Sequence, residues 1–424
     1  MASTSNIILS FLMVFSMLMA GCTGEEIAEP EDIVGCMDNQ AINYDPDATV
    51  EITDTCEYAD SDNDGIRDID EILGCMDSAA TNFDSLATDD DGSCLIPWES
   101  EYGVNWVQQF PGGDCECADG TEWFFWSRDA DPSKVLLYFE GGGACFEDSG
   151  CKFQGGTFKT SISSDGPADG SVFNSDFGGV SNLRNPANPF ADWSIVYVPY
   201  CTGDIHLGNA VTEYAYAEVN HSGHNNAQAA YNFLTSHYTD ASKIFVTGSS
   251  AGSFPAPFYG ILASNSYPDA EITVFNDGSG GVYTNGTYDI VSNWNLNETM
   301  SDFLSEYQDF NFFDSADMVI QTWNHDNFIR FGRYDNTEDN TMKYFNALLG
   351  NDVQVTYSSQ IFASEQKIED AGIDVSGYIA PGPDHTILGS DRFYTLEVEG
   401  VLFVDWFTAF VNGENIDDVH CTNC

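Results

Sequence analysis

The chain has 424 residues, of which 68 are acidic and 12 are Lys or Arg, so its formal net charge is -56. A surface this negative repels nucleic-acid phosphates and anionic membranes, which excludes nucleic-acid binding as a main activity. Hydrophobic residues make up 42% of the chain, which is enough for a sizeable core and excludes a mainly disordered protein. We interpret the charge as adaptation to salt or divalent cations. A cation-storage protein would be acidic throughout, whereas the middle of this chain has ordinary globular composition.

The N-terminus, residues 1–21, has the features of a signal peptide. Its apolar stretch, 7–20, is of signal-peptide length and short for a membrane span. The stretch ends in Met19-Ala20-Gly21-Cys22, and small residues directly before a cysteine resemble a lipoprotein box. We therefore expect an exported protein that is either secreted or anchored to the cell surface by a lipid on Cys22, its one expected link to a membrane. Residues 22–34 are acidic and aperiodic, as in a flexible tether.

Residues 35–97 contain a repeat. The sequence Gly35-Cys36-Met37-Asp38 recurs as Gly74-Cys75-Met76-Asp77, and each copy closes with another cysteine. A unit this small cannot bury a core of its own, and a disulfide between its ends would stabilise it by about 3 kcal/mol. We expect two disulfides, Cys36–Cys56 and Cys75–Cys94. The repeats resemble short acidic modules of extracellular proteins, a resemblance that implies no activity.

The segment 60–71, between the two copies, has the pattern of a calcium-binding loop. Oxygen-bearing side chains stand at its first, third, fifth, ninth and twelfth positions, and a glycine at the sixth allows the turn. With the backbone carbonyl of the seventh position, these oxygens surround one ion of calcium size. The expected Ca²⁺ ligands are Asp60, Asp62, Asp64, Ile66, Asp68 and Glu71. The ion would be structural, and the alternative is a solvated acidic linker.

From residue 98 to 424 the sequence predicts a catalytic α/β domain, because strands that alternate with helices form a mostly parallel sheet covered on both faces. Neighbouring strands are expected at 122–127 and 134–139. Further strands are expected at 193–199, 244–247, 271–275, 318–323 and 378–379, and helices at 225–237 and 402–411.

The strand 244–247 runs into Gly248-Ser249-Ser250-Ala251-Gly252. A Gly-x-Ser-x-Gly motif between a strand and a helix is typical of the nucleophile elbow of α/β hydrolases, in which the acid and then the histidine follow the serine along the chain. Of the seven histidines, His325, His385 and His420 follow Ser250. His385 lies in a Gly/Pro loop before the closing helix. Asp326 directly follows the predicted strand 318–323.

The predicted triad is therefore Ser250 as nucleophile, His385 as general base and Asp326 as the orienting acid. Asp277, after an earlier strand, is the alternative acid. Three glycines after strand 134–139 would let main-chain N–H groups converge on a developing oxyanion. The expected oxyanion hole is Gly141, Gly142, Gly143 and Ala251. A flexible turn is the alternative, and a dinucleotide loop fits worse because its glycine spacing fails at Phe146.

Four motifs in consistent order resemble the pectin acetylesterase and Notum family. They are Tyr138-Phe139-Glu140-Gly141-Gly142-Gly143-Ala144-Cys145, Pro199-Tyr200-Cys201-Thr202-Gly203-Asp204-Ile205-His206, Thr247-Gly248-Ser249-Ser250-Ala251-Gly252 and Asp384-His385-Thr386-Ile387-Leu388. The resemblance covers about 114–424 and implies an α/β-hydrolase-like serine esterase that needs no cofactor. It carries the triad roles onto Ser250, Asp326 and His385. In the second motif, Asp204 and His206 would either contact substrate hydroxyls or only hold their loop.

The cysteines of the catalytic domain fit an oxidising compartment. Cys145 and Cys151 are close enough to pair, and Cys201 is expected to be left over. The remaining four would tie the two ends of the domain together: Cys115, Cys117, Cys421 and Cys424. Their Cys-x-Cys and Cys-x-x-Cys spacings also fit zinc, but export favours disulfides.

Together these features predict an exported serine carboxylesterase that removes acyl groups, most simply acetyl, through an acyl-enzyme. An acylated saccharide as substrate follows from the resemblance alone, and a negative surface does not favour a polyanion such as pectin without cations or a positive cleft. Two alternatives stay open. One is a thioesterase or peptidase with the same triad, and the other is a surface-binding module without activity.

Overall fold

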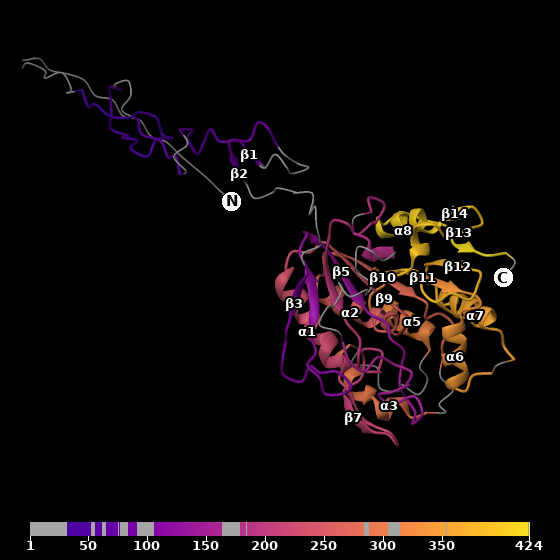
Figure 1. The fold of residues 1–424 in the computed structure, drawn as a ribbon. Helices are drawn as coiled ribbons and strands as arrows, with labels where there is room; N and C mark the ends of the chain where they lie inside the picture. Colours follow the sequence, from indigo (N-terminus) through magenta and orange to yellow (C-terminus); the bar gives the residue numbers. More distant parts are fainter. Residues whose placement is uncertain are drawn as a thin grey trace, which may run out of the picture. The chain divides into compact units, whose positions relative to one another are not determined.

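The computed structural model describes residues 32–51, 56–61, 65–74, 76, 84–90, 106–162, 179–183, 185–283, 288–303, 314–352, 354–422 and 424. The chain divides into two compact units, Met1–Ile96 and Pro97–Cys424 (Figure 1). Several sequence predictions lie outside the described residues: the signal peptide, Cys22, most of the tether, Asp62, Asp64 and the pair Cys75–Cys94.

In the first unit, the predicted disulfide Cys36–Cys56 is present. Two short strands, β1 (Leu73–Gly74) and β2 (Asp89–Asp90), pair in parallel. The first glycine of each repeat packs in the same way. A Cβ atom on Gly35 would lie 3.1 Å from the Cβ of Ala48, and one on Gly74 would lie 3.2 Å from the Cβ of Ala87. The repeated sequence therefore encodes a repeated close contact.

The second unit is built on a nine-stranded sheet of the described residues, in the order β15-β12-β11-β10-β9-β5-β6-β4-β3. All pairs from β15 to β6 are parallel, and β4 and β3 add an antiparallel edge. This mostly parallel sheet, flanked by helices, confirms the predicted α/β-hydrolase-like fold. The strands are β3 (Val107–Gln109), β4 (Phe125–Arg128), β5 (Asp131–Phe139), β6 (Trp193–Val198), β9 (Lys243–Ser249), β10 (Glu271–Asp277), β11 (Arg330–Asn336), β12 (Val375–Ala380) and β15 (Val419–His420).

The central strands are buried on both faces, which is why they are almost continuously apolar. In β5, Val135, Leu137 and Phe139 belong to one hydrophobic core, whereas Leu136 and Tyr138 belong to another. Successive side chains of a strand point to opposite faces, so the sheet separates these two cores.

Helices cover both cores. The larger core includes residues of α1 (Gly223–His237), α2 (Ala256–Ser266), α5 (Ser315–His325), α6 (Asn340–Leu348) and α7 (Tyr357–Asp370). The smaller core includes the aromatic face of α8 (Phe403–Val411). Shorter elements are α3 (Ile290–Asn293), α4 (Leu296–Thr299), and two hairpins, β7 (Ala210–Glu213) with β8 (Glu218–His221) and β13 (Glu397–Val398) with β14 (Val401–Leu402). Among the described residues no helix has the length and apolar character of a membrane span.

Two predictions about the strands are wrong. Residues 318–323 belong to the helix α5, because Met318, Val319 and Thr322 form one buried face at helical spacing. The strand at this point of the fold is the next segment, β11, which was missed. In addition, β6 lies between β4 and β5, so these two strands are not neighbours.

The disulfides of the second unit are partly as predicted. Cys145 pairs with Cys151 as expected. Cys117 pairs with Cys201, and Cys421 with Cys424, so the cysteines do not tie the two ends of the domain together. The unpaired cysteine among the described residues is Cys115 and not Cys201. Burial raises the pKa of the Cys115 thiol to about 11, which keeps it protonated and unreactive.

Loss of the Cys117–Cys201 disulfide should destabilise the domain more than loss of Cys145–Cys151. The paired residues are 84 positions apart in the first case and 6 in the second. Since a longer loop loses more entropy on closure, we expect losses of about 4 and about 2 kcal/mol in the free energy of unfolding. Urea unfolding without reductant of the two double Cys→Ser variants measures both values. Equal losses would contradict the loop-length argument.

Candidate active site

Ser250 lies at a tight corner between β9 and α2. Its backbone φ is 56°, a left-handed conformation that is costly for a residue with a side chain. The two arms of the corner touch. A Cβ atom on Gly248 would lie 2.3 Å from the carbonyl oxygen of Gly252, and one on Gly252 would lie 2.1 Å from that of Phe139. Both glycines are therefore required, and the backbone has the geometry of a nucleophile elbow.

The three glycines after β5 run alongside this corner. A Cβ atom on Gly141 would lie 2.4 Å from the carbonyl oxygen of Ser249 and 3.0 Å from the Cβ of Ser250. Within the described residues, no acceptor takes up the N–H groups of Gly141, Gly142, Gly143 or Ala251. Unpaired amides next to a strained serine are what an oxyanion hole requires.

The glycine loop is held in place through Glu140. The Glu140 carboxylate accepts hydrogen bonds from the N–H of Tyr200 at 2.9 Å and from Nζ of Lys159 at 2.6 Å. Its carbonyl oxygen lies 2.8 Å from Nε2 of His206. Since burial lowers the pKa of His206 to about 4, the ring is neutral and can donate this bond without a charge.

Asp204 and His206 hold their loop and do not face a substrate. Their residues are 0% and 1% exposed. Asp204 accepts hydrogen bonds from the hydroxyl of Thr202 at 2.5 Å and from the N–H of Gly223 at 2.8 Å, although burial raises the pKa of its carboxyl to about 6. Of the two roles considered for this pair, the geometry supports the structural one.

His385 has a buried carboxylate partner. Its Nδ1 lies 2.6 Å from Oδ2 of Asp339, a residue whose side chain is 1% exposed. The other oxygen of Asp339 accepts the N–H groups of Thr341 and Met342 at the start of α6, at 2.8 and 2.9 Å. Nε2 of His385 is buried and has no hydrogen-bond partner in the described part of the chain. The imidazole is therefore oriented on one side and free to take a proton on the other.

The predicted acid, Asp326, lies at the opposite edge of the sheet from His385. The carboxylate next to His385 is that of Asp339. Asp326 precedes β11, and its carboxylate accepts the N–H of Phe328 at 2.9 Å. Ser250, His385 and Asp339 all follow the carboxyl ends of parallel strands, at one edge of the sheet. The 7 residues of β11, at about 3.3 Å each, separate that edge from the other by about 20 Å.

A sequence signal for Asp339 exists. It stands three residues after β11 and directly before Asn340, where α6 begins with Asp339 as its N-cap. Aspartate is a preferred N-cap residue, and Met342 and Phe345 give the helix an apolar face. The signal was missed because the preceding strand was placed one element too early.

Asp277, the alternative acid, holds the histidine loop by its backbone. It is fully buried and accepts hydrogen bonds from the N–H groups of Ile387 and Leu388 at 2.9 and 3.0 Å. It also accepts the hydroxyl of Ser249 at 2.6 Å. Asp277 therefore fastens the loop of His385 to the residue before Ser250, and burial raises the pKa of its carboxyl to about 6. Ser250 and His385 make no direct hydrogen bond in this structure, which is common without a substrate.

An apolar cavity of about 60 Å³ opens beside Ser250. Its walls include residues of the oxyanion loop, the loops between strands, and the helix that Asp339 caps: Ala144, Phe146, Phe254, Trp294, Met342 and Phe345. The indole N–H of Trp294 donates to the carbonyl oxygen of Cys145 at 3.0 Å, which fixes this wall. The lining accepts an uncharged, apolar group.

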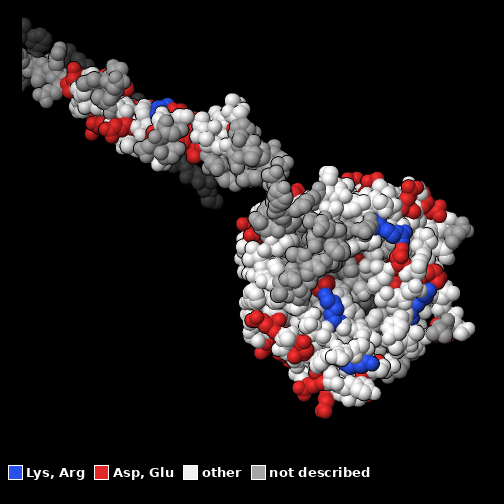
Figure 2. Space-filling model, in the orientation of Figure 1, with Lys and Arg blue, Asp and Glu red and all other residues white. Residues whose placement is uncertain are grey.

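Positive charge is scarce around the domain. On the face drawn in Figure 2, acidic side chains outnumber Lys and Arg. Lys159 is next to the oxyanion loop, since its N–H donates to the carbonyl oxygen of Gly142 at 3.0 Å, but its ammonium group is paired with Glu140.

Comparison with known proteins agrees with this geometry. No curated protein matches the chain. The family model for Pectinacetylesterase matches residues 99–311, half of the chain, and this segment includes the oxyanion loop and the elbow. With the α/β-hydrolase-like sheet and the strained serine, this match shows that the chain belongs to the pectinacetylesterase family, whose members are carboxylic ester hydrolases.

Proposed function

We propose that this hydrolase is a serine carboxylesterase whose catalytic triad is Ser250, His385 and Asp339. The observation that carries the proposal is the hydrogen bond of His385 to the buried carboxylate of Asp339, with Nε2 of the imidazole left without a partner among the described residues. The strained serine at the same edge of the sheet supports it further.

In this mechanism Nε2 of His385 takes the proton of Ser250 as the hydroxyl oxygen attacks the ester carbonyl carbon. Asp339 keeps Nδ1 protonated and stabilises the imidazolium. The N–H groups of Gly142, Gly143 and Ala251 stabilise the oxyanion of the tetrahedral intermediate. The intermediate collapses, the alcohol leaves with the proton from His385, and water releases the acid by the same steps.

The apolar cavity favours a short acyl group. At about 60 Å³, and with roughly 10–15 Å³ needed for one water molecule, it has room for roughly four to six groups of that size. An acetyl group fits with space to spare, as does a butyryl group, whereas a long fatty acyl chain does not. The acetyl ester is also what the family predicts.

We propose an acylated saccharide outside the cell as the source of this ester, with the protein exported and either secreted or lipid-anchored at Cys22. Mass spectrometry of the mature protein decides between the two forms. A lipid on Cys22 supports the anchor, and an unmodified N-terminus beyond Cys22 removes it.

We also propose a structural Ca²⁺ in the segment 60–71. Asp60 supports it, because its Oδ1 is buried and has no partner among the described residues, while its Oδ2 accepts the N–H of Gly65 at 3.1 Å. Gly65 has a φ of 95°, which allows the turn that the loop needs.

Replacing Asp339 by Asn should lower kcat/KM for an acetyl ester on the order of 10³- to 10⁴-fold, because the imidazole would lose its acidic partner. Asn also caps helices, so the fold should persist. The matched control is Asp326→Asn, which should keep the wild-type rate. Hydrolysis of 4-nitrophenyl acetate measures both, with Ser250→Ala as the inactive reference. A loss in Asp326→Asn and none in Asp339→Asn would overturn the triad. An acetyl thioester and an acetyl amide, assayed in parallel, separate esterase from thioesterase and peptidase activity.

The cavity predicts a preference for short acyl chains. We expect 4-nitrophenyl acetate and butyrate to be hydrolysed at least roughly tenfold more efficiently than the octanoate, since each misplaced methylene costs about 1–3 kcal/mol. Phe345→Ala should enlarge the cavity and narrow this difference. Tyr344→Ala, an exposed aromatic on the same helix, is the control and should not. Equal rates on acetate and octanoate in the wild type would contradict the size argument.

The full-length protein should bind Ca²⁺ with a Kd of roughly 10⁻⁴ to 10⁻³ M, as extracellular calcium modules do. Glu71→Gln should weaken this site at least roughly tenfold, because the last position supplies a bidentate carboxylate. Isothermal titration calorimetry measures the affinity, and Glu57→Gln, in the same unit, controls for the loss of one charge. The same affinity in all three proteins would mean that the ion does not bind in this loop.

A further inference from the structure

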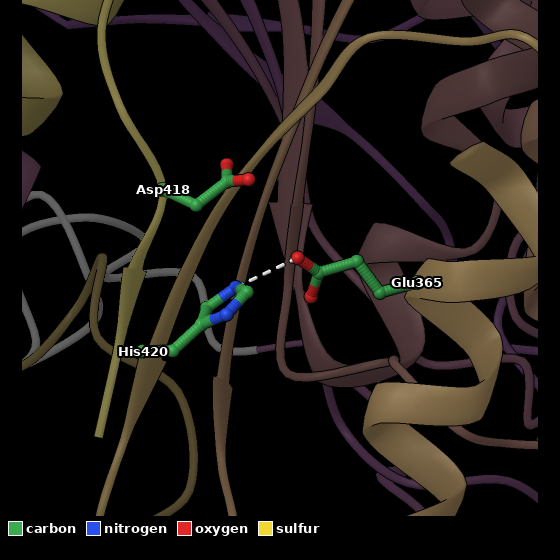
Figure 3. Close-up of side chains that lie close together, drawn as sticks. All are labelled: Glu365, Asp418 and His420. Carbon is green, nitrogen blue, oxygen red and sulfur yellow. Dashed lines mark hydrogen bonds and ion pairs between the residues drawn. The ribbon is translucent and has the colours of Figure 1, made fainter. Parts of the chain in front are cut away.

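A second cluster of titratable side chains lies at the β15 end of the sheet, where three strands separate it from β9 and the elbow. Glu365 comes from α7, Asp418 directly precedes β15, and His420 lies in that strand. Each of the three residues offers one oxygen or nitrogen atom, and these atoms all lie within 4.8 Å of one another (Figure 3). At this spacing the three side chains could hold one metal ion.

The backbone of β12 forms the floor of the cluster. The N–H of Gly377 donates to Oδ1 of Asp418 at 2.8 Å. A Cβ atom on Gly377 would lie 2.6 Å from Oε1 of Glu365 and 3.1 Å from Oε2. The missing side chain therefore leaves the space that the Glu365 carboxylate fills. Nε2 of His420 lies 2.7 Å from Oε1 of the same carboxylate, the contact drawn as a dashed line in Figure 3.

Glu365 is only partly satisfied. Its side chain is 3% exposed, and Oε2 has no hydrogen-bond partner in the described part of the chain. Leaving one oxygen of a buried carboxylate unpaired is costly. The buried cation Arg333 is already engaged by Asp335, to which its Nε and Nη2 donate at 2.8 and 2.6 Å. The cluster therefore contains a buried ligand atom without a partner.

The charges around His420 are unbalanced. His420 can carry at most one positive charge, and it lies in one cluster with the two carboxylates of Glu365 and Asp418. An ion pair with His420 neutralises a single carboxylate. A doubly charged cation would offset the excess.

We propose that Glu365, Asp418 and His420 bind a divalent transition-metal cation, of which Zn²⁺ is the representative. An imidazole nitrogen with two carboxylates is a donor set for such ions, whereas Ca²⁺ and Mg²⁺ prefer oxygen alone. The metal replaces the proton that His420 and Glu365 share. Asp418 is exposed and can close on the ion, and water completes the coordination. The ion would fasten the short edge strand β15 to β12 and α7, next to the Cys421–Cys424 disulfide.

Titration calorimetry with ZnCl₂ on the full-length, chelator-treated protein tests the site, with excess Ca²⁺ present to occupy acidic surface groups and the loop 60–71. We expect one Zn²⁺ site that His420→Gln abolishes and Asp418→Asn weakens roughly 10- to 100-fold, in the range found when metal-site partners are lost. His237→Gln is the matched control, because His237 is an exposed histidine whose Nε2 lies 3.1 Å from Asp129, and it should bind like the wild type.

Two results would overturn the proposal. The wild type could take up no Zn²⁺, which would leave an ion pair alone, or His420→Gln could bind it with unchanged stoichiometry and affinity, which would place the metal elsewhere. Asp418 is a surface residue, so its variant keeps the test valid if a change at His420 impairs folding. Co²⁺ bound in place of Zn²⁺ should show a visible absorption band in the wild type and in His237→Gln, and none in His420→Gln. Hydrolysis of 4-nitrophenyl acetate should be the same in all four proteins.

Discussion

The site depends on the close approach of two backbones where β5 and β9 end. These strands pair in parallel, with Phe139 opposite Gly248. Beyond these strands, the backbone around Gly141, Gly248 and Gly252 is packed so closely that a side chain at any of the three positions would clash with a carbonyl oxygen. This close approach fixes the positions of the unpaired N–H groups of the glycine loop relative to Ser250. The geometry of the candidate site is thus a result of strand register, because a shift of the register would separate these N–H groups from Ser250.

The loop that contains His385 is held in place by a separate set of hydrogen bonds. His385 lies in a loop after β12, which β11 and β10 separate from β9, and no direct hydrogen bond joins it to Ser250. Asp277, at the end of the strand next to β9, spans this gap by accepting the hydroxyl of Ser249 and two N–H groups of the histidine loop. A carboxylate in this position acts on the histidine through the backbone of its loop, whereas Asp339 bonds to the imidazole itself.

The sequence predicted what is encoded locally. The elbow and the glycine loop each follow from a few consecutive residues, and the α/β class follows from the alternation of short strand and helix patterns along the chain. Asp339 was missed despite its local N-cap signal, because the strand before it, β11, contains Arg333 and Asp335, which pair with each other at 2.6 Å inside the protein. With Arg330 at its start, β11 has three charged residues in seven, which is unusual for a central strand. The apolar segment before it, which is the helix α5, was therefore predicted as the strand, and the acid was predicted after that segment. The prediction that Cys201 is left unpaired was wrong for a related reason. Its partner, Cys117, is 84 residues away in the sequence and comes close only in the folded chain.

The charge of the protein bears on which alcohol it releases. In the mechanism proposed above, the acyl group enters the apolar cavity, whereas the alcohol stays outside it, on a protein rich in acidic groups. The basic residue next to the oxyanion loop, Lys159, is paired with Glu140 and offers little net positive charge to a substrate. A polyuronate would therefore approach against the field of the protein unless cations screened it. A neutral acetylated saccharide meets no such barrier, and the physical argument favours it even though the family is known by the name of pectin.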